Sequence, residues 1–134
     1  MGRRAVQGAV VVILIVEDDQ LVRDLVAEAL SEGGFEVEAT TTGEEAVTRL
    51  KGDTNKYRAL ITDINLLGML NGWEVGHRAR ELNPDIPVIY MTGAAADQWS
   101  ANGVPNSILL NKPFAPAQIV AAVAQLLNAS APPT

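Results

Sequence analysis

A single carboxylate, Asp63, stands directly after the short apolar run from Ala59 to Thr62. Such a run is typical of a strand that is buried on both faces, so the carboxylate is placed where the strand ends. Ligands of an open α/β sheet gather outside the carboxyl ends of its strands. We therefore interpret Asp63 as a reactive group, although an aspartate standing alone at such a position is more often a turn residue.

Polar groups also follow three other apolar stretches, which we interpret as strands over residues 10–16, 87–91 and 107–110. These groups are Glu17, Asp18 and Asp19 after the first stretch, Thr92 with Gly93 after the second, and Lys112 after the third. The carboxyl ends of parallel strands meet at one edge of a sheet. We therefore expect these side chains to converge with Asp63 on one site.

The acidic residues of this site predict a divalent cation. Neighbouring carboxylates repel each other when all are ionised, and a cation removes that cost. Oxygen donors with open positions for water suit Mg²⁺. We assign Asp18 and Asp63 as direct ligands and Glu17 as a ligand through water. The backbone carbonyl of Asn65 is a further predicted donor, whereas Asp19 is interpreted as a helix cap.

With the cation bound, Asp63 is predicted to attack phosphorus and to form an acyl phosphate. Lys112 and the hydroxyl of Thr92 are expected to contact other phosphoryl oxygens and to offset their charge. Gly93 leaves room for the phosphoryl group to approach. The predicted chemistry is therefore phosphoryl transfer to a carboxylate.

The elements that must position these groups alternate along the chain. Beside the strands already named, we predict an edge strand over 35–40 and helices over 20–30, from Thr42 to about 50, from Asn71 to about 82, and over 115–127. Short connections and right-handed crossovers then favour a flavodoxin-like, doubly wound α/β fold. Its five-stranded parallel sheet has the predicted order 2-1-3-4-5, with helices on both faces. We expect one domain over residues 9–128, between a disordered leader (1–8) and a flexible tail (129–134).

The composition limits the classes of partner. The 134 residues carry a net charge of -6 and include no cysteine, which disfavours binding to DNA or to an anionic membrane and excludes disulfides. No apolar stretch approaches the roughly 20 residues of a membrane span. The run after Arg3 and Arg4 ends in acids and not in a signal-peptide cleavage site. We expect a cytoplasmic protein that binds neither nucleic acid nor membranes.

The ordered set of motifs resembles the response-regulator receiver domain of two-component signalling, in its stand-alone form. The motifs are Glu17-Asp18 after the first strand, Asp63 after the third, Thr92-Gly93 after the fourth and Lys112-Pro113-Phe114 after the fifth. The resemblance covers about residues 10–127. It implies phosphorylation of Asp63 by a phosphohistidine on a sensor histidine kinase or phosphotransfer protein, followed by self-catalysed hydrolysis. It also implies switching of a downstream protein contact on the face of strands four and five, and a cis peptide between Lys112 and Pro113.

Three features depart from the pattern of that family. Leu109 stands three positions before the lysine, where the family commonly has an aromatic switch residue. The loop over residues 64–70 lacks the common proline and is longer by one residue. Residues 94–105 contain Gly103 and Pro105 and predict either one short helix at most or a mobile loop in place of the regular fourth helix.

Two other functions use the same fold. A Mg²⁺-dependent phosphohydrolase that forms an aspartyl phosphate would usually want a second acid two residues after the nucleophile, where this chain has Asn65. A flavodoxin-like nucleotide binder would need a phosphate cradle after the first strand, where this chain has three acids. We therefore expect a signalling phosphoacceptor and not an enzyme that acts on another substrate.

Some residues outside the site are also interpreted. His77 is expected to be a solvated helix position, and Trp73 and Trp99 are expected to serve packing or partner contacts. The apolar loop from Leu66 to Leu70 has two interpretations, because it either packs against the third helix or forms an exposed contact patch.

Overall fold

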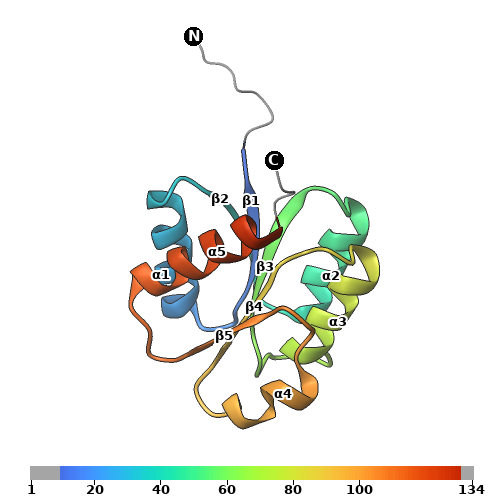
Figure 1. Cartoon of the computed structure of the whole chain (residues 1–134). Helices are drawn as coiled ribbons and strands as arrows, with labels where there is room; N and C mark the ends of the chain where they lie inside the picture. Colours follow the sequence, from blue (N-terminus) through green and yellow to red (C-terminus); the bar gives the residue numbers. More distant parts are fainter. Residues whose placement is uncertain (1–9, 131–134) are drawn as a thin grey trace.

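Five parallel strands form the centre of the structure, in the order β2-β1-β3-β4-β5 (Figure 1). This order confirms the predicted flavodoxin-like, doubly wound fold. The computed structural model describes residues 10–130. The predicted leader (1–8) and residues 131–134 of the predicted tail lie outside the described residues.

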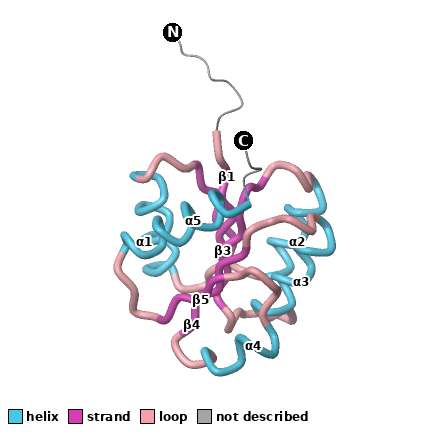
Figure 2. Tube along the Cα trace, viewed as in Figure 1, coloured by secondary structure: helices cyan, strands magenta, loops and turns pink. Residues whose placement is uncertain are grey.

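The strands are β1 (Val12–Val16), β2 (Glu36–Thr40), β3 (Tyr57–Asp63), β4 (Val88–Thr92) and β5 (Ile108–Asn111). The helices are α1 (Gln20–Glu32), α2 (Gly43–Gly52), α3 (Gly72–Leu82), α4 (Trp99–Asn102) and α5 (Pro116–Ser130), with a 3₁₀ helix η2 (Ala96–Gln98) just before α4. Figure 2 shows the same path coloured by secondary structure. Within the part of the chain that is described, no helix is long and apolar enough to cross a membrane.

The helices cover both faces of the sheet, α1 and α5 on one face and α2 and α3 on the other (Figure 1). Successive side chains of a strand point to opposite faces, so β1 serves both cores. Ile13 and Ile15 pack in the core under α1 and α5, while Leu14 and Val16 pack under α2 and α3. All four side chains are fully buried. This explains why β1 reads as a continuous apolar run with no alternation.

Side-chain caps define where the helices begin. Asn71 and Glu74 form the complete predicted capping box of α3, each accepting a hydrogen bond from the backbone of the other at 2.9 Å. The box predicted at the start of α2 forms only in part. Thr42 accepts from the Glu45 N–H at 3.1 Å, but the Glu45 carboxylate accepts from the Thr41 N–H and not from Thr42. The positions of these helix starts were predicted correctly.

Several predicted boundaries differ from those of the structure by one to three residues, among them the end of α5 and the start of β3. Helix α5 continues to Ser130, so the first two residues of the predicted tail are helical. Strand β3 begins at Tyr57 instead of Ala59, because the Tyr57 ring is buried and its hydroxyl donates to Glu38 on β2 at 2.6 Å. Arg49 and Lys56 form ion pairs with the same Glu38 carboxylate. The face of β2 that was expected to be solvated is therefore partly covered.

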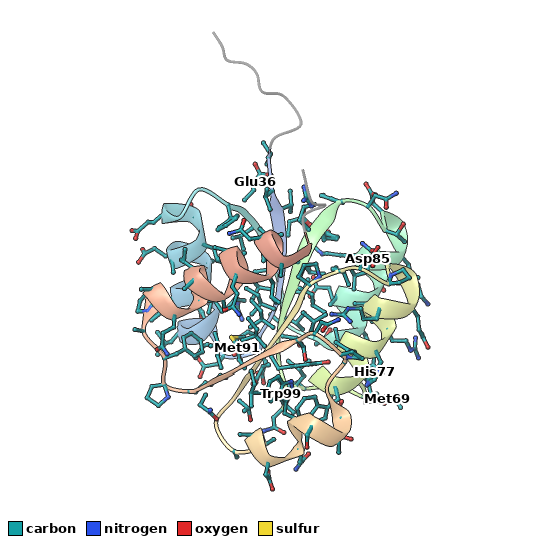
Figure 3. The ribbon with its side chains drawn as sticks, in the orientation of Figure 1. Glu36, Met69, His77, Asp85, Met91 and Trp99 are labelled. Carbon is teal, nitrogen blue, oxygen red and sulfur yellow. The ribbon has the colours of Figure 1, made fainter. Side chains whose placement is uncertain are left out.

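The segment before β5 holds only one short helical turn beyond η2, as predicted. His77 on α3 is exposed, but its Nε2 lies 2.9 Å from the carbonyl oxygen of Asn102 at the end of α4 (Figure 3). Arg80 donates to the carbonyl of Pro105 at 2.6 Å. The interpretation of His77 as a merely solvated position was incomplete, because it links α3 to α4. Trp99 donates to Ser107 at 2.9 Å and is about one-third exposed.

Tyr90 on β4 fills the space beside this segment. Its ring packs against Trp73 with centroids 4.8 Å apart, and its buried hydroxyl accepts from the Val104 N–H at 3.1 Å. A Cβ on Gly76 of α3 would overlap the Tyr90 hydroxyl, so only glycine fits there. Tyr90 is also the register partner of Leu109 on β5. An aromatic side chain therefore lies beside position 109, but on β4 and not on β5.

Candidate functional site

Three carboxylates meet at the carboxyl ends of β1 and β3. One oxygen each of Glu17, Asp18 and Asp63 lies within 4.8 Å of the other two. Glu17 is fully buried, Asp63 is 6% exposed, and Asp18 is half-buried. The predicted convergence of acids from two strand ends is therefore present in the structure.

A lysine from the end of the sheet completes the cluster. The Nζ atom of Lys112 lies 2.9 Å from Glu17 Oε1 and 3.3 Å from Asp63 Oδ1. Its backbone N–H donates to the carbonyl of Thr92 at 2.8 Å, which ties the end of β5 to that of β4. The peptide between Lys112 and Pro113 is cis, as the resemblance implied.

Burial dominates the electrostatics of the acids. It raises the pKa of Asp63, while the charge of Lys112 and its hydrogen bond act in the opposite direction. It also raises the pKa of Glu17, again against the hydrogen bond from Lys112. Burial by itself lowers the pKa of Lys112, but the hydrogen bond to Glu17 and the charge of Asp63 outweigh it, so this pKa is raised. One lysine thus stays charged but does not fully compensate the buried carboxylates.

The turn after β1 is held by its own hydrogen bonds. The Glu17 N–H donates to the Thr40 carbonyl at 3.0 Å, and Glu17 Oε2 accepts from the Asp19 N–H at 3.1 Å. Asp19 caps α1 by accepting from the Leu21 N–H at 2.9 Å, as predicted. Arg23 donates to the Glu17 carbonyl at 3.0 Å and joins α1 to the turn. Arg23 was not predicted from the sequence, because a contact six residues away through a turn leaves no periodic signal.

The remaining predicted residues lie around this cluster. Thr92 directly follows Met91, the register partner of Asp63, and is fully buried. Its Oγ1 accepts from the Ala94 N–H at 3.1 Å and the Ala95 N–H at 2.8 Å, so its hydroxyl holds the loop after β4. The hydroxyl proton stays free to donate to a further acceptor.

Asn65 and Gly93 are both exposed loop residues at this end of the sheet. A Cβ placed on Gly93 would meet no heavy atom within 4 Å apart from its chain neighbours. The space predicted beside Gly93 is therefore open. The roles assigned to Asn65, Gly93 and Thr92 stay predictions.

The loop between β3 and α3 has both features that the sequence offered as alternatives, residues packed against the protein and an exposed apolar patch. Leu66 and Leu70 are partly buried against the core that lies under α2 and α3. Leu67 and Met69 are 66% and 90% exposed. Leu66 and Leu70 thus anchor the loop, while Leu67 and Met69 lie exposed between them.

The donor set suits a hard cation. All three side chains of the cluster offer carboxylate oxygens, and no sulfur or imidazole lies among them. Mg²⁺ is bound through one or two carboxylates together with water and phosphate oxygens. Asp18 is only half-buried, so solvent reaches part of this cluster. The residues present therefore fit the cation predicted from the sequence.

The chain belongs to the response regulator receiver domain family, whose sequence profile matches residues 13–124. The response regulator receiver protein CpdR from Brucella abortus is 30% identical over 120 residues, which cover 88% of this chain and 98% of CpdR. That extent agrees with the stand-alone type of receiver that the sequence resembles. Response regulator MprA from Mycobacterium bovis is 31% identical over 122 residues, and the chain spans about half the length of that relative, 52%.

Solved structures agree with this membership. A response regulator receiver protein from Sinorhizobium medicae superposes with a TM-score of 0.88 at 39% identity, over 92% of this chain and 98% of that one. The receiver domain of sensor histidine kinase PA1611 from Pseudomonas aeruginosa superposes with a TM-score of 0.77 at 24% identity, over 90% and 99%. That structure has a magnesium ion coordinated in its active-site cleft. At this lower identity the second likeness shows the fold alone.

Proposed function

We propose that the chain is a phosphoacceptor that receives a phosphoryl group on Asp63 from a phosphohistidine of a sensor histidine kinase or phosphotransfer protein. One observation supports this above the others. Glu17, Asp18 and Asp63 share a cluster with Lys112, in which buried negative charge exceeds positive charge. Such a cluster is suited to a cation, which offsets its excess negative charge, and then to a phosphoryl group, whose oxygens meet the positive charge of the cation and of the lysine.

The transfer uses the ionised Asp63 as nucleophile. One carboxylate oxygen forms a bond to phosphorus while the bond between phosphorus and the donor imidazole nitrogen breaks, and the electron pair stays on that nitrogen. Lys112, whose Nζ is 3.3 Å from Asp63 Oδ1, keeps the carboxylate ionised and is placed to contact a phosphoryl oxygen. Thr92 supplies its hydroxyl proton to another phosphoryl oxygen.

The residues that would hold Mg²⁺ are Asp18 and Asp63 directly, Glu17 through water and Asn65 through its backbone carbonyl. The ion would neutralise charge on the phosphoryl oxygens. Glu17 fits an indirect role, because both of its oxygens already have partners in Lys112 and the Asp19 N–H. The magnesium ion in the PA1611 receiver domain supports the same chemistry for a protein of this fold.

The output of this reaction is a change in protein contacts. We propose that the phosphorylated chain binds a downstream protein through the face of β4 and β5, and that it catalyses only its own phosphorylation and hydrolysis. Position 65 is an exposed asparagine, so the second acid of a phosphohydrolase is absent from that position. The cytoplasmic location expected from the sequence is part of this proposal.

Phosphorylation with a small donor tests the proposal directly. The protein is incubated with Mg²⁺ and acetyl phosphate, and its intact mass is measured. We expect a gain of one phosphoryl group, stable in acid and labile in base, which Asp63→Asn abolishes and the surface control Asp24→Asn retains. Asp18→Asn should lose the gain together with Mg²⁺ affinity, whereas Lys112→Ala should keep the affinity. Phosphorylation that persists in Asp63→Asn would refute the assignment.

A further inference from the structure

The loop that follows Asp63 is fixed by a residue of another element. Glu44 lies in the first turn of α2, and its Oε2 accepts from the Met69 N–H at 2.7 Å and from the Leu70 N–H at 3.3 Å. These residues are separated by 25 and 26 positions in the sequence. The Met69 side chain is 90% exposed and lies at the surface (Figure 3), so burial of that side chain does not set its place.

Two further features dock the loop on the start of α2. Thr42 and Leu67 form a parallel β-bridge. Gly68 has φ +96°, and a Cβ there would lie 2.7 Å from Glu44 Oε1. Only glycine reaches this conformation without strain, and it lets the backbone approach the carboxylate closely. The Glu44 carboxylate is therefore enclosed by loop backbone on one side.

The other end of the loop is fixed as well. The Ile64 N–H donates to the Met91 carbonyl at 3.1 Å, and the Gly72 N–H donates to the Ile64 carbonyl at 2.8 Å. Asn65 thus lies between an end tied to β4 and an end tied to α2. Both ends of the segment that contains Asn65 are therefore held, and Glu44 accepts the hydrogen bonds at the second end.

We propose that Glu44 is a positioning residue, which holds this loop so that the backbone carbonyl of Asn65 is ready to bind the cation. The inference rests on the proposed function, which places Mg²⁺ at the acid cluster. A ligand that is already ordered binds more tightly, since ordering it costs no free energy on binding. The hydrogen bonds from Met69, from its own backbone N–H and from Leu70 lower the pKa of the Glu44 carboxyl, which shows that the loop amides favour its ionised form.

The first test needs no metal. Hydrogen exchange of the Met69 and Leu70 amides is measured by NMR in the metal-free full chain. In Glu44→Ala both amides should exchange about tenfold faster, because their shared acceptor is lost. Glu45→Gln is the matched control, since it removes the same charge from the same helical turn but has no bond to the loop. Unchanged exchange in Glu44→Ala would overturn the proposal.

The second test is the affinity for Mg²⁺, measured by titration calorimetry. Glu44→Ala should bind about fivefold more weakly than the wild type, the factor expected when a hydrogen bond of about 1 kcal/mol no longer orders the loop. Glu44→Gln should retain more of the affinity, because its amide oxygen still accepts from Met69 while the charge is lost. An equal loss of Mg²⁺ affinity in Glu44→Ala, Glu44→Gln and Glu45→Gln would show an effect of charge alone and would overturn the proposal. Affinities equal to that of the wild type in all three variants would also overturn it. A wild type that binds no Mg²⁺ would instead refute the proposed function itself.

Discussion

Replacement of Asp63 by asparagine should stabilise the metal-free protein. The change keeps the size and shape of the side chain and removes one buried charge from a cluster in which the acids outnumber the lysine. A substitution is expected to remove function and yet stabilise the protein only where the native residue destabilises the folded state. The free energy of unfolding therefore reports whether the acids are arranged for a cation.

The magnitude follows from the distances. At an effective dielectric constant of about 20, two unit charges 4.8 Å apart repel by about 3.5 kcal/mol, and carboxylate oxygens of both Glu17 and Asp18 lie within that distance of Asp63. Lys112 at 3.3 Å attracts the same carboxylate by about 5 kcal/mol. Repulsion of Asp63 thus exceeds attraction by at least about 2 kcal/mol, and burial further disfavours its charged form. We expect Asp63→Asn to raise the free energy of unfolding by about 2 kcal/mol.

The assay is urea unfolding at pH 7 with EDTA, for the wild type, Asp63→Asn and the surface control Asp24→Asn. Because burial raises the pKa of Asp63 in the folded state, protonation favours folding. This contribution is fully present below the unfolded pKa of about 3.9 and is lost as the pH rises through the higher folded pKa. The advantage of Asp63→Asn should therefore be largest at pH 7 and shrink towards pH 4.

Added Mg²⁺ provides the complementary measurement. It should stabilise the wild type and reduce the difference from Asp63→Asn, since ligand binding to the folded state adds to stability. The reasoning is refuted if Asp63→Asn is no more stable than the wild type in EDTA at pH 7 while Asp24→Asn is neutral. It is equally refuted if the difference between the two proteins grows on acidification.

Further substitutions test other contacts of the structure. Lys112→Ala should lower the free energy of unfolding of the metal-free protein by about 3 to 5 kcal/mol in urea, because its two buried carboxylate partners lose their positively charged neighbour, whereas the exposed control Lys51→Ala should have little effect. Tyr90→Phe should cost about 1.5 kcal/mol and speed hydrogen exchange of the Val104 amide, which loses its acceptor. Gly76→Ala should cost at least about 2 kcal/mol despite the better helix propensity of alanine, because its methyl group would overlap the Tyr90 hydroxyl. The double variant Gly76→Ala with Tyr90→Phe should lose less free energy of unfolding than the sum for the two single variants, because the overlapping hydroxyl is gone. Strictly additive losses in urea unfolding would contradict the proposed overlap.

In the segment before β5, local sequence patterns predicted the length of the helix but not its contacts with other elements. Gly103 and Pro105 limited the helix there to a short one, and the structure has the four-residue α4. The same pattern contained no sign that His77 and Arg80 of α3 would bond to carbonyls of this segment. Those bonds depend on how α3 packs on the sheet, which is not encoded in the spacing of residues along the segment.

By itself the sequence determined the order of the strands, most of the helix starts and the end of the sheet at which the polar groups gather. These features follow from local causes: apolar runs such as β1 form buried strands, and Asn71 with Glu74 caps a helix wherever that helix packs. Only the tertiary structure decided which side chains touch. The bond between Glu17 and Lys112 joins residues 95 positions apart, and Glu44 reaches the loop after Asp63 from another helix. Such contacts arise when strands pair and helices settle on the sheet, so their distances are properties of the packed molecule and not of any stretch of chain.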